Sequence, residues 1–418
     1  MKKSLSGDNS VLSLFTGAGG LDLGLEEAGF SNRLCVEVDP DARSTLKKNR
    51  PGWILSTPGD IHELAPEQIL SQANLNPGEV TLLVGGPPCQ PFSKSAYWAR
   101  SGARGLQDPR ADTLKAYIKV ISTAKPRVLL LENVIGLATK SKNDWINTLR
   151  IELQKINRIN KTKYNPQVFY VNSADYGVPQ IRERVFVLAT ADGQKFVMPR
   201  PTHGLHSGLE PFRTAWDAIG HLDVDDWPGE LNPMGKWAAL LSSIPEGHNY
   251  QWHTPRGKGE PLFGWRTRFW SFLLKLAKNL PSWTIQASPG PATGPFHWKS
   301  RLLSTAELAR LQTFPVGYQV EGNRRSAHRQ LGNAVPSAIG EMFGLEIRRQ
   351  LLGEQVRQDL TLIPIKREDC PSPESPSSVP RQYLSLRSEH KDHPGIGQGP
   401  AARIVEKFQS SEVMTTGI

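Results

Sequence analysis

Short apolar runs alternate with segments of helical spacing through residues 10–190 of the chain. The runs are rich in Val, Leu and Ile, and the segments between them, "GLDLGLEEAG" and "DTLKAYIKVISTA", repeat apolar residues every three to four positions. This alternation predicts an α/β fold around a parallel sheet, whose ligands bind at the carboxyl ends of the strands. The predicted strands are "SVLSLF", "RLCVEV", "VTLLVG", "PRVLLLEN", "QVFYVN" and "RVFVLAT".

The pattern changes at about residue 191, where glycine, proline and tryptophan replace the long periodic segments. Residues 191–300 hold eight of the eleven tryptophans. Helical spacing returns in "LSTAELARLQTF" and "AVPSAIGEMFGLEIRRQLL". We therefore expect one domain made of residues 10–190 and 301–353, with a smaller, irregular domain inserted at 191–300. Residues 354–418 are polar and proline-rich, so we expect a disordered tail.

The composition favours a polyanionic binding partner. The formal net charge is +10, and residues 354–418 carry eight Lys/Arg against nine Asp/Glu, so the excess lies in the preceding body. Nucleic acid is a partner that such a charge suits. No membrane-length apolar run or signal peptide is found, and we expect a cytoplasmic protein. The cysteines, Cys35, Cys89 and Cys370, are too few for a disulfide framework or a zinc site, which leaves single-thiol chemistry open.

The glycine-rich turn in "FTGAGGLDLG" follows the first predicted strand and begins the first predicted helix. Asp22 stands where a dinucleotide-binding fingerprint would have glycine, which argues against NAD and a pyrophosphate site. Glu37 ends the second strand, where it could accept hydrogen bonds from a ribose, and Asp60 in "PGDIHEL" could accept one from an adenine amino group. Acidic partners without a pyrophosphate site suit S-adenosylmethionine. The alternative is an ordinary turn with solvated carboxylates.

Reactive side chains follow three other strands. Cys89 lies in "GGPPCQPFS", where prolines would hold the sulfur in place; a buried filler cysteine is the alternative. Glu132 closes an apolar strand in "LLLENV", where a carboxylate is costly unless it has a partner or a task. Gln180, Arg182 and Arg184 alternate in "VPQIRERVF", so in a strand they would share one face; a solvated strand edge is the alternative.

Together these segments resemble the cytosine-C5 DNA methyltransferase family. The family's motifs occur in its usual order as "FTGAGGLDLG", "EVD", "GDI", "GGPPCQPFS", "ENV", "QIRERVF", "RLLSTAELARLQTFP" and "QLGNAVP", from residue 11 to about 340. The resemblance implies a Rossmann-like sheet that binds S-adenosylmethionine, and it implies that the insert is a target-recognition domain.

The resemblance also implies residue roles. The Cys89 thiolate would add to C6 of a cytosine flipped out of duplex DNA. Glu132 would bind N3 and the amino group, and Arg182 and Arg184, with Gln180, would hold O2. The implied cofactor-binding residues are Phe15, Gly17, Gly19, Gly20, Leu21, Glu37, Val38, Asp60, Ile61, Pro88, Asn333 and Val335.

Several further expectations concern the partners. Arg100, Arg104 and Arg110 lie in a Ser/Gly-rich stretch that suits a loop closing over DNA, and "RGKGEPLFGWRTRFW" is our candidate for groove and phosphate contacts. We expect a monomer that modifies double-stranded DNA, and a restriction endonuclease that acts on the same site without a stable complex. The alternatives are a cytosine-C5 methyltransferase of tRNA and a non-catalytic DNA-binding relative. Methylation of an exocyclic amino group is disfavoured, because a cysteine follows the prolines.

Overall fold

The computed structural model describes residues 9–87, 112–134, 144–264 and 270–387. The chain divides into two compact units. The first comprises Met1–Val224, Asn279–Ser288 and Ser304–Cys370, and the second comprises Asp225–Lys278, Pro289–Leu303 and Pro371–Ile418.

A six-stranded sheet forms the centre of the first unit, in the order β2-β1-β3-β4-β7-β5. All six strands predicted from the sequence are confirmed. The β1, β2, β3 and β4 neighbours are parallel, whereas β7 runs antiparallel to both β4 and β5. The reversal follows from chain length, since the ten residues between β5 and β7 are too few for the crossover that a parallel pair needs. The strands are β1 (Ser10–Leu14), β2 (Ser31–Val36), β3 (Leu82–Gly85), β4 (Val128–Val134), β5 (Gln167–Asn172) and β7 (Glu183–Thr190).

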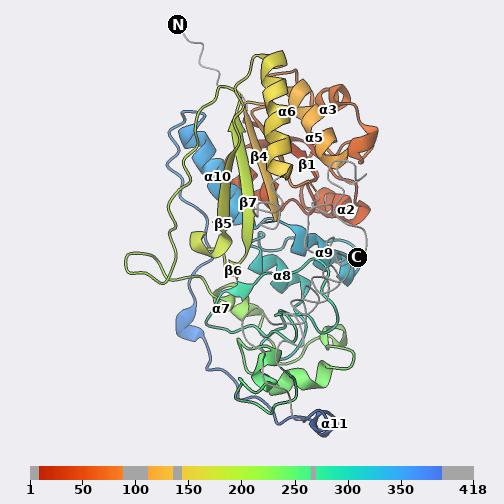
Figure 1. Cartoon of the computed structure of the whole chain (residues 1–418), viewed down its shortest axis with the longest axis vertical. Helices are drawn as coiled ribbons and strands as arrows, with labels where there is room; N and C mark the ends of the chain where they lie inside the picture. Colours follow the sequence, from red (N-terminus) through yellow and green to blue (C-terminus); the bar gives the residue numbers. More distant parts are fainter. Residues whose placement is uncertain (1–8, 88–111, 135–143, 265–269, 388–418) are drawn as a thin grey trace, which may run out of the picture. The chain divides into compact units, whose positions relative to one another are not determined.

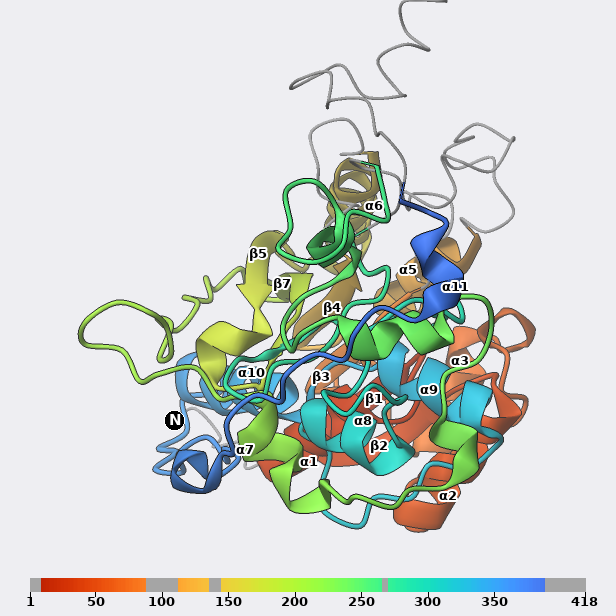
Figure 2. The same ribbon diagram turned by 90° about the horizontal axis from the view of Figure 1, so that it is seen from below.

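Helices cover both faces of this sheet (Figures 1 and 2). One face packs on α3 (Pro66–Ala73), α5 (Asp112–Ala124) and α6 (Asp144–Asn160), and the other packs on α1 (Gly20–Glu27) and α10 (Ser337–Gln350). A Cβ on Gly24 would lie 2.0 Å from the carbonyl oxygen of Ser337, so glycine is what allows α1 and α10 to pack this closely. The C-terminal helix predicted from the sequence is therefore part of the sheet domain.

Three further helices stand near the carboxyl ends of the parallel strands: α2 (Pro40–Asn49), α8 (Thr305–Leu311) and α9 (Arg324–Asn333). Each begins at a side chain that accepts hydrogen bonds from the first-turn N–H groups, namely Asp39, Ser304 and Asn323. The same unit contains α7 (Ala215–Ile219) and a second sheet, in which β6 (Gln180–Ile181) pairs with β8 (Ser282–Trp283). None of the helices in the described part of the chain is long and apolar enough to span a membrane.

The second unit is built mostly from short 3-10 turns and irregular chain, with α11 (Arg381–Leu384) as its α-helix among the described residues. Its core is aromatic: Trp237 packs against Phe263, Phe272 and Tyr383. Trp237 of the predicted insert thus contributes to a core.

The boundaries of the units differ from those expected of the insert. Residues 191–224 belong to the first unit, where Phe196 is buried beside Phe343. Residues 279–288 belong there too, because β8 pairs with β6. Contacts between residues that are far apart in sequence decide both boundaries. A change in local composition gives no information about such contacts.

The tail was expected to be disordered from residue 354, and for residues 354–387 this expectation was wrong. Ile363 is buried in the first unit and Tyr383 in the second. The Tyr383 hydroxyl also donates a hydrogen bond to the carbonyl oxygen of Lys236 at 2.8 Å. Single apolar residues spaced among prolines can each fill a separate hollow, although the segment has no periodic pattern. The remainder of the tail, from residue 388, lies outside the described residues.

Candidate active site

A cavity of about 600 Å³ opens at the carboxyl ends of β1 to β4 in the first unit. Its size is within the range usual for small-molecule sites. Residues 329–335, from α9 and the turn after it, complete its wall. Ten of the predicted site residues line it: Phe15, Gly17, Gly20, Leu21, Glu37, Val38, Glu132, Arg184, Asn333 and Val335.

Two positions of the turn after β1 require glycine. Gly17 has φ +57°, a conformation that side-chain-bearing residues seldom adopt. A Cβ on Gly20 would lie only 2.2 Å from the carbonyl oxygen of Val335. Glycine at position 20 therefore lets the residues around Val335 close one side of the cavity.

The Glu37 carboxylate is held by two backbone donors. Its Oε2 accepts from Gly17 N at 2.6 Å, and its Oε1 accepts from Asp39 N at 2.7 Å. Burial raises the pKa of Glu37, and the two hydrogen bonds oppose that shift. A carboxylate has about four acceptor positions, so these hydrogen bonds leave acceptor capacity for the hydroxyl groups of a ligand.

Asp60, expected to accept a hydrogen bond from an adenine amino group, and Ile61, expected to bind the cofactor, do not line this cavity. Asp60 begins a short 3-10 helix and accepts a hydrogen bond from His62 N at 2.9 Å, while Ile61 is buried in the core. Gly19 is likewise buried without lining the cavity, and a Cβ there would lie 2.9 Å from Leu46.

Glu132 and Arg184 come together across β4 and β7. The register pairs Glu132 with Phe186 and Val134 with Arg184, so both polar side chains are on one face of the sheet. Arg184 Nε lies 2.9 Å from Glu132 Oε1, and both side chains are largely buried. Burial raises the pKa of Glu132, and the charges of Arg184 and Arg182 oppose the rise.

The expectation that Gln180, Arg182 and Arg184 share one strand face was wrong. The chain leaves the small β6–β8 sheet after Ile181 and enters the central sheet at Glu183, so the alternation is interrupted at Arg182. Arg182 is fully buried, and its Nη atoms donate to the carbonyl oxygens of Ile285 and Gly332 at 3.2 and 2.8 Å.

Gln180 is fully buried as well. Its Nε2 donates to Gln312 Oε1 at 3.2 Å, and its Oε1 accepts from Ile285 N at 3.2 Å. Of the three side chains that were expected to hold O2, only Arg184 lines the cavity.

The cavity also extends to the segment that leads into "PPCQPFS". Gly86 and Pro87 line it, and Asn133 Nδ2 donates to the Pro87 carbonyl oxygen at 3.0 Å. This bond ties the end of β4 to the chain just before Pro88 and Cys89. Those two residues lie outside the described residues, as do Arg100, Arg104 and Arg110.

Comparisons with known proteins agree with this geometry. Residues 9–349 match the family model described as C-5 cytosine-specific DNA methylase. The Type II methyltransferase M.SacI of Streptomyces achromogenes is 37% identical over an alignment of 371 residues, and the match covers 82% of this chain and 93% of that protein. The Type II methyltransferase M.NgoFVII of Neisseria gonorrhoeae is 33% identical over 339 residues, which are 80% of this chain and 84% of that protein.

The chain belongs to the C-5 cytosine-specific DNA methylase family. Solved structures agree on the fold. A mutant of Spodoptera frugiperda DNMT2 has a TM-score of 0.56 at 17% identity, covering 81% of this chain and 99% of that one. The Entamoeba histolytica methyltransferase EhMeth has a TM-score of 0.52 at 15% identity, covering 82% and 98%. The resemblance inferred from the motifs is thus confirmed, and the enzyme is a DNA cytosine-5-methyltransferase.

Three charged residues of the methyltransferase cavity, Asp22, Asp39 and Arg329, were missed as site residues. Asp22 lines the cavity, is buried, and accepts a hydrogen bond from Asn32 Nδ2 at 2.9 Å. Burial raises its pKa to about 7. Arg329 lines the cavity from α9, and its signal was its place one helical turn before Asn333.

The segment predicted to make groove and phosphate contacts belongs to the second unit of the methyltransferase. Within "RGKGEPLFGWRTRFW", Arg256 and Lys258 are exposed, whereas Leu262 and Phe263 belong to the core. Residues 265–269 lie outside the described ranges. Among the described residues, no group of His, Cys, Asp or Glu could hold a metal ion.

Proposed function

We propose that this methyltransferase transfers a methyl group from S-adenosylmethionine to C5 of a cytosine in a specific double-stranded DNA sequence. Family membership supports the reaction. The observation that carries the proposal for this site is that one cavity contains both Glu37 on its turn after β2 and the Glu132–Arg184 pair. One end therefore suits a nucleoside, and the other suits a polar base.

The residues of the cavity fit the cofactor. Glu37 keeps acceptor positions for ribose hydroxyls, and Val38 beside it is 64% exposed, which suits contact with a planar base. Gly17 and Gly20 keep side chains out of the space, and Asn333 supplies an amide for the amino acid end. S-adenosylmethionine, when bound, supplies an electrophilic methyl group.

The nucleophile is Cys89, two residues after Pro87. Its thiolate adds to C6 of the cytosine, and the electron pair of the C5–C6 double bond becomes available at C5 for the new bond to the methyl carbon, whose bond to the sulfonium sulfur breaks. A base then removes the C5 proton, the C5–C6 double bond forms again, and the S–C6 bond breaks. C6 is inaccessible within the stacked duplex, so the cytosine must be flipped out of the helix.

Glu132 binds the cytosine edge that carries N3 and the amino group. Its raised pKa favours a carboxyl that can share its proton with N3 as the thiolate adds. Arg184, at 2.9 Å from Glu132 Oε1, limits this shift and orients the carboxyl. Arg182 acts indirectly, as a positioning residue. It precedes β7, and its buried guanidinium donates to the carbonyl oxygen of Gly332 on α9, whose residues form one wall of the cavity.

We assign target recognition to the second unit, whose exposed Arg256 and Lys258 suit phosphate contacts. Both relatives named above are Type II methyltransferases. By that analogy the enzyme protects host DNA from an endonuclease that cuts the same sequence, without a stable complex between the two. We propose further that it acts as a monomer.

The test has two stages. Bisulfite sequencing of DNA from cells that express the protein should reveal one methylated sequence context. A duplex with 5-fluorocytosine at that position should then form a covalent adduct in the presence of S-adenosylmethionine, because the fluorine cannot be removed as a proton is. Cys89→Ala should form no adduct, whereas the control Cys370→Ala should form as much as the wild type. An adduct with Cys89→Ala would refute the assignment of the nucleophile.

Glu132→Gln should lower kcat by about 10²- to 10⁴-fold, as expected for loss of a general acid, with little change in the KM for S-adenosylmethionine. Tritium release from C5-labelled cytosine measures the rate. Methyl transfer to tRNA but not to plasmid DNA would replace DNA as the substrate. Tight DNA binding without tritium release by the wild type would identify a non-catalytic relative instead.

A further inference from the structure

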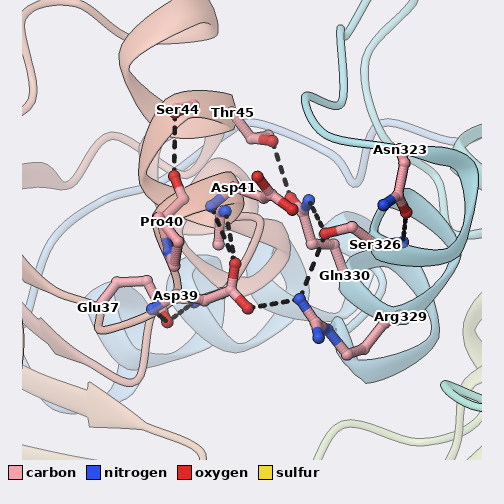
Figure 3. A network of polar contacts seen from close by, with 12 residues as sticks. Glu37, Asp39, Pro40, Asp41, Ser44, Thr45, Asn323, Ser326, Arg329 and Gln330 are labelled. Carbon is pink, nitrogen blue, oxygen red and sulfur yellow. Dashed lines mark hydrogen bonds and ion pairs between the residues drawn. The ribbon is translucent and has the colours of Figure 1, made fainter.

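An ion pair joins two helices at the edge of the cofactor cavity. Arg329 Nη2 on α9 lies 2.6 Å from Oδ2 of Asp39, the residue that precedes α2, and 290 positions separate the two in sequence (Figure 3). Both residues line the cavity, as do Glu37 on one side and Asn333 on the other. The pair therefore connects the turn proposed to bind ribose with the wall proposed to bind the amino acid end.

Asp39 makes a different contact with each of its polar groups. Its backbone N–H donates to Glu37 Oε1 at 2.7 Å. Its Oδ1 accepts from Asp41 N and Ala42 N, at 3.0 and 3.1 Å, and so caps α2. Only Oδ2 is left for Arg329. The position of Glu37 is thus coupled through one residue to the guanidinium on α9.

The same two helices are also joined by neutral hydrogen bonds. Thr45 Oγ1 donates to Gln330 Oε1 at 2.8 Å, and both side chains are buried (Figure 3). The backbone N–H of Glu321, in the chain just before α9, also donates to Thr45 Oγ1 on α2 at 2.9 Å. Loss of the ion pair should therefore leave α2 and α9 packed together, and its effect should be confined to the cavity edge.

We propose that the Asp39–Arg329 pair is an electrostatic latch that positions Glu37 against the wall formed by residues 329–335 and thereby sets the affinity for the cofactor. The inference rests on the proposed function. Asp39 and Arg329 act as positioning residues. Their side chains are 29% and 46% exposed, so a pair of this kind contributes little to global stability and is weakened by salt. Its effect should appear in binding.

Asp39→Asn is the selective perturbation, since the asparagine oxygen can still cap α2 but its amide group cannot pair with Arg329. The dissociation constant for S-adenosylmethionine, measured without DNA, should rise about three- to fivefold, a size typical of a partly exposed ion pair. The KM for the cofactor should rise equally, with kcat nearly constant. Arg329→Gln should match this effect, and Arg329→Lys should recover part of it.

Two further measurements separate the latch from a general structural role. The double variant Asp39→Asn/Arg329→Gln should bind no more weakly than the weaker single variant, because the two changes remove one interaction. Raising the salt concentration should weaken cofactor binding more in the wild type than in Arg329→Gln. The control is Glu354→Gln, which removes the Arg348 pair elsewhere in the unit, at 20% and 34% exposure, and should leave cofactor binding unchanged.

The outcomes distinguish failure of the latch from failure of the proposed function. A wild-type protein that binds no S-adenosylmethionine would refute the proposed function. If the wild type binds it and both Asp39→Asn and Arg329→Gln bind it equally well, the latch is refuted. Should Asp39→Asn unfold at a lower temperature than the control, Arg329→Gln decides alone, because it leaves the cap of α2 intact.

Discussion

Gly20→Ala tests whether close packing around the glycine turn shapes the cofactor site. The added Cβ would lie 2.2 Å from the Val335 carbonyl oxygen, and real Cβ atoms essentially never come closer than 3.0 Å. The wall must therefore move by at least the difference, about 0.8 Å, or the turn must move instead. Such overpacking typically costs about 1–3 kcal/mol, and the better helix propensity of alanine offsets up to about 1 kcal/mol of it.

The effect on cofactor binding should be at least comparable with the effect on stability. A displacement near 1 Å in a positioning element can cost on the order of 100-fold in rate. We expect the affinity for S-adenosylmethionine to fall at least about tenfold, while the free energy of unfolding falls by about 1–2 kcal/mol. Equilibrium binding and urea unfolding measure the two quantities.

Gly52→Ala is the matched control. Gly52 is exposed, its φ is not left-handed, and a Cβ there would meet nothing within 4 Å. This variant should keep the wild-type affinity and unfold within about 0.5 kcal/mol of the wild type. If Gly20→Ala were indistinguishable from Gly52→Ala in both assays, the argument that the wall depends on glycine at position 20 would be refuted.

Two further predictions concern burial. Because burial raises the pKa of Asp22 from 3.8 to about 7, the folded chain keeps a proton that the unfolded chain releases, so stability should fall as the pH rises from about 4 to 7. Asp22→Asn should therefore be more stable than the wild type by up to about 4 kcal/mol at pH 8 and by little at pH 4. If urea unfolding showed the same pH dependence for the variant as for the wild type, the burial argument would be contradicted. Tyr383→Ala should cost the second unit about 3–5 kcal/mol, since Tyr383 packs against Trp237; resistance to proteolysis equal to that of the wild type would count against this packing.

Much of the fold and half of the site could be predicted from the sequence. Strand positions follow from apolar runs, and the glycine turn, Glu37 and Glu132 follow from their places at strand ends. These are local patterns, and the residues that create them lie within a few positions of one another. The family's motifs, read in order, also predicted that Asn333 and Val335, far along the chain, contribute to the cavity.

Other features depend on partners that local patterns do not reveal. The alternation in "QIRER" predicted one face for Arg182 and Arg184, but the change of sheet buries Arg182 against Ile285 and Gly332. Asp60 was predicted to contact an adenine; in the structure it caps a short helix and does not line the cavity.

The sequence by itself therefore determined the strands, the family and the chemistry available at each strand end. Only the tertiary structure decided which charged groups meet. The raised pKa of Asp22 and the pairing of Asp39 with Arg329 both depend on desolvation and contact, and these are set by chain segments up to 290 residues apart. Local periodicity carries no information about such neighbours, because it records only which face of an element is buried.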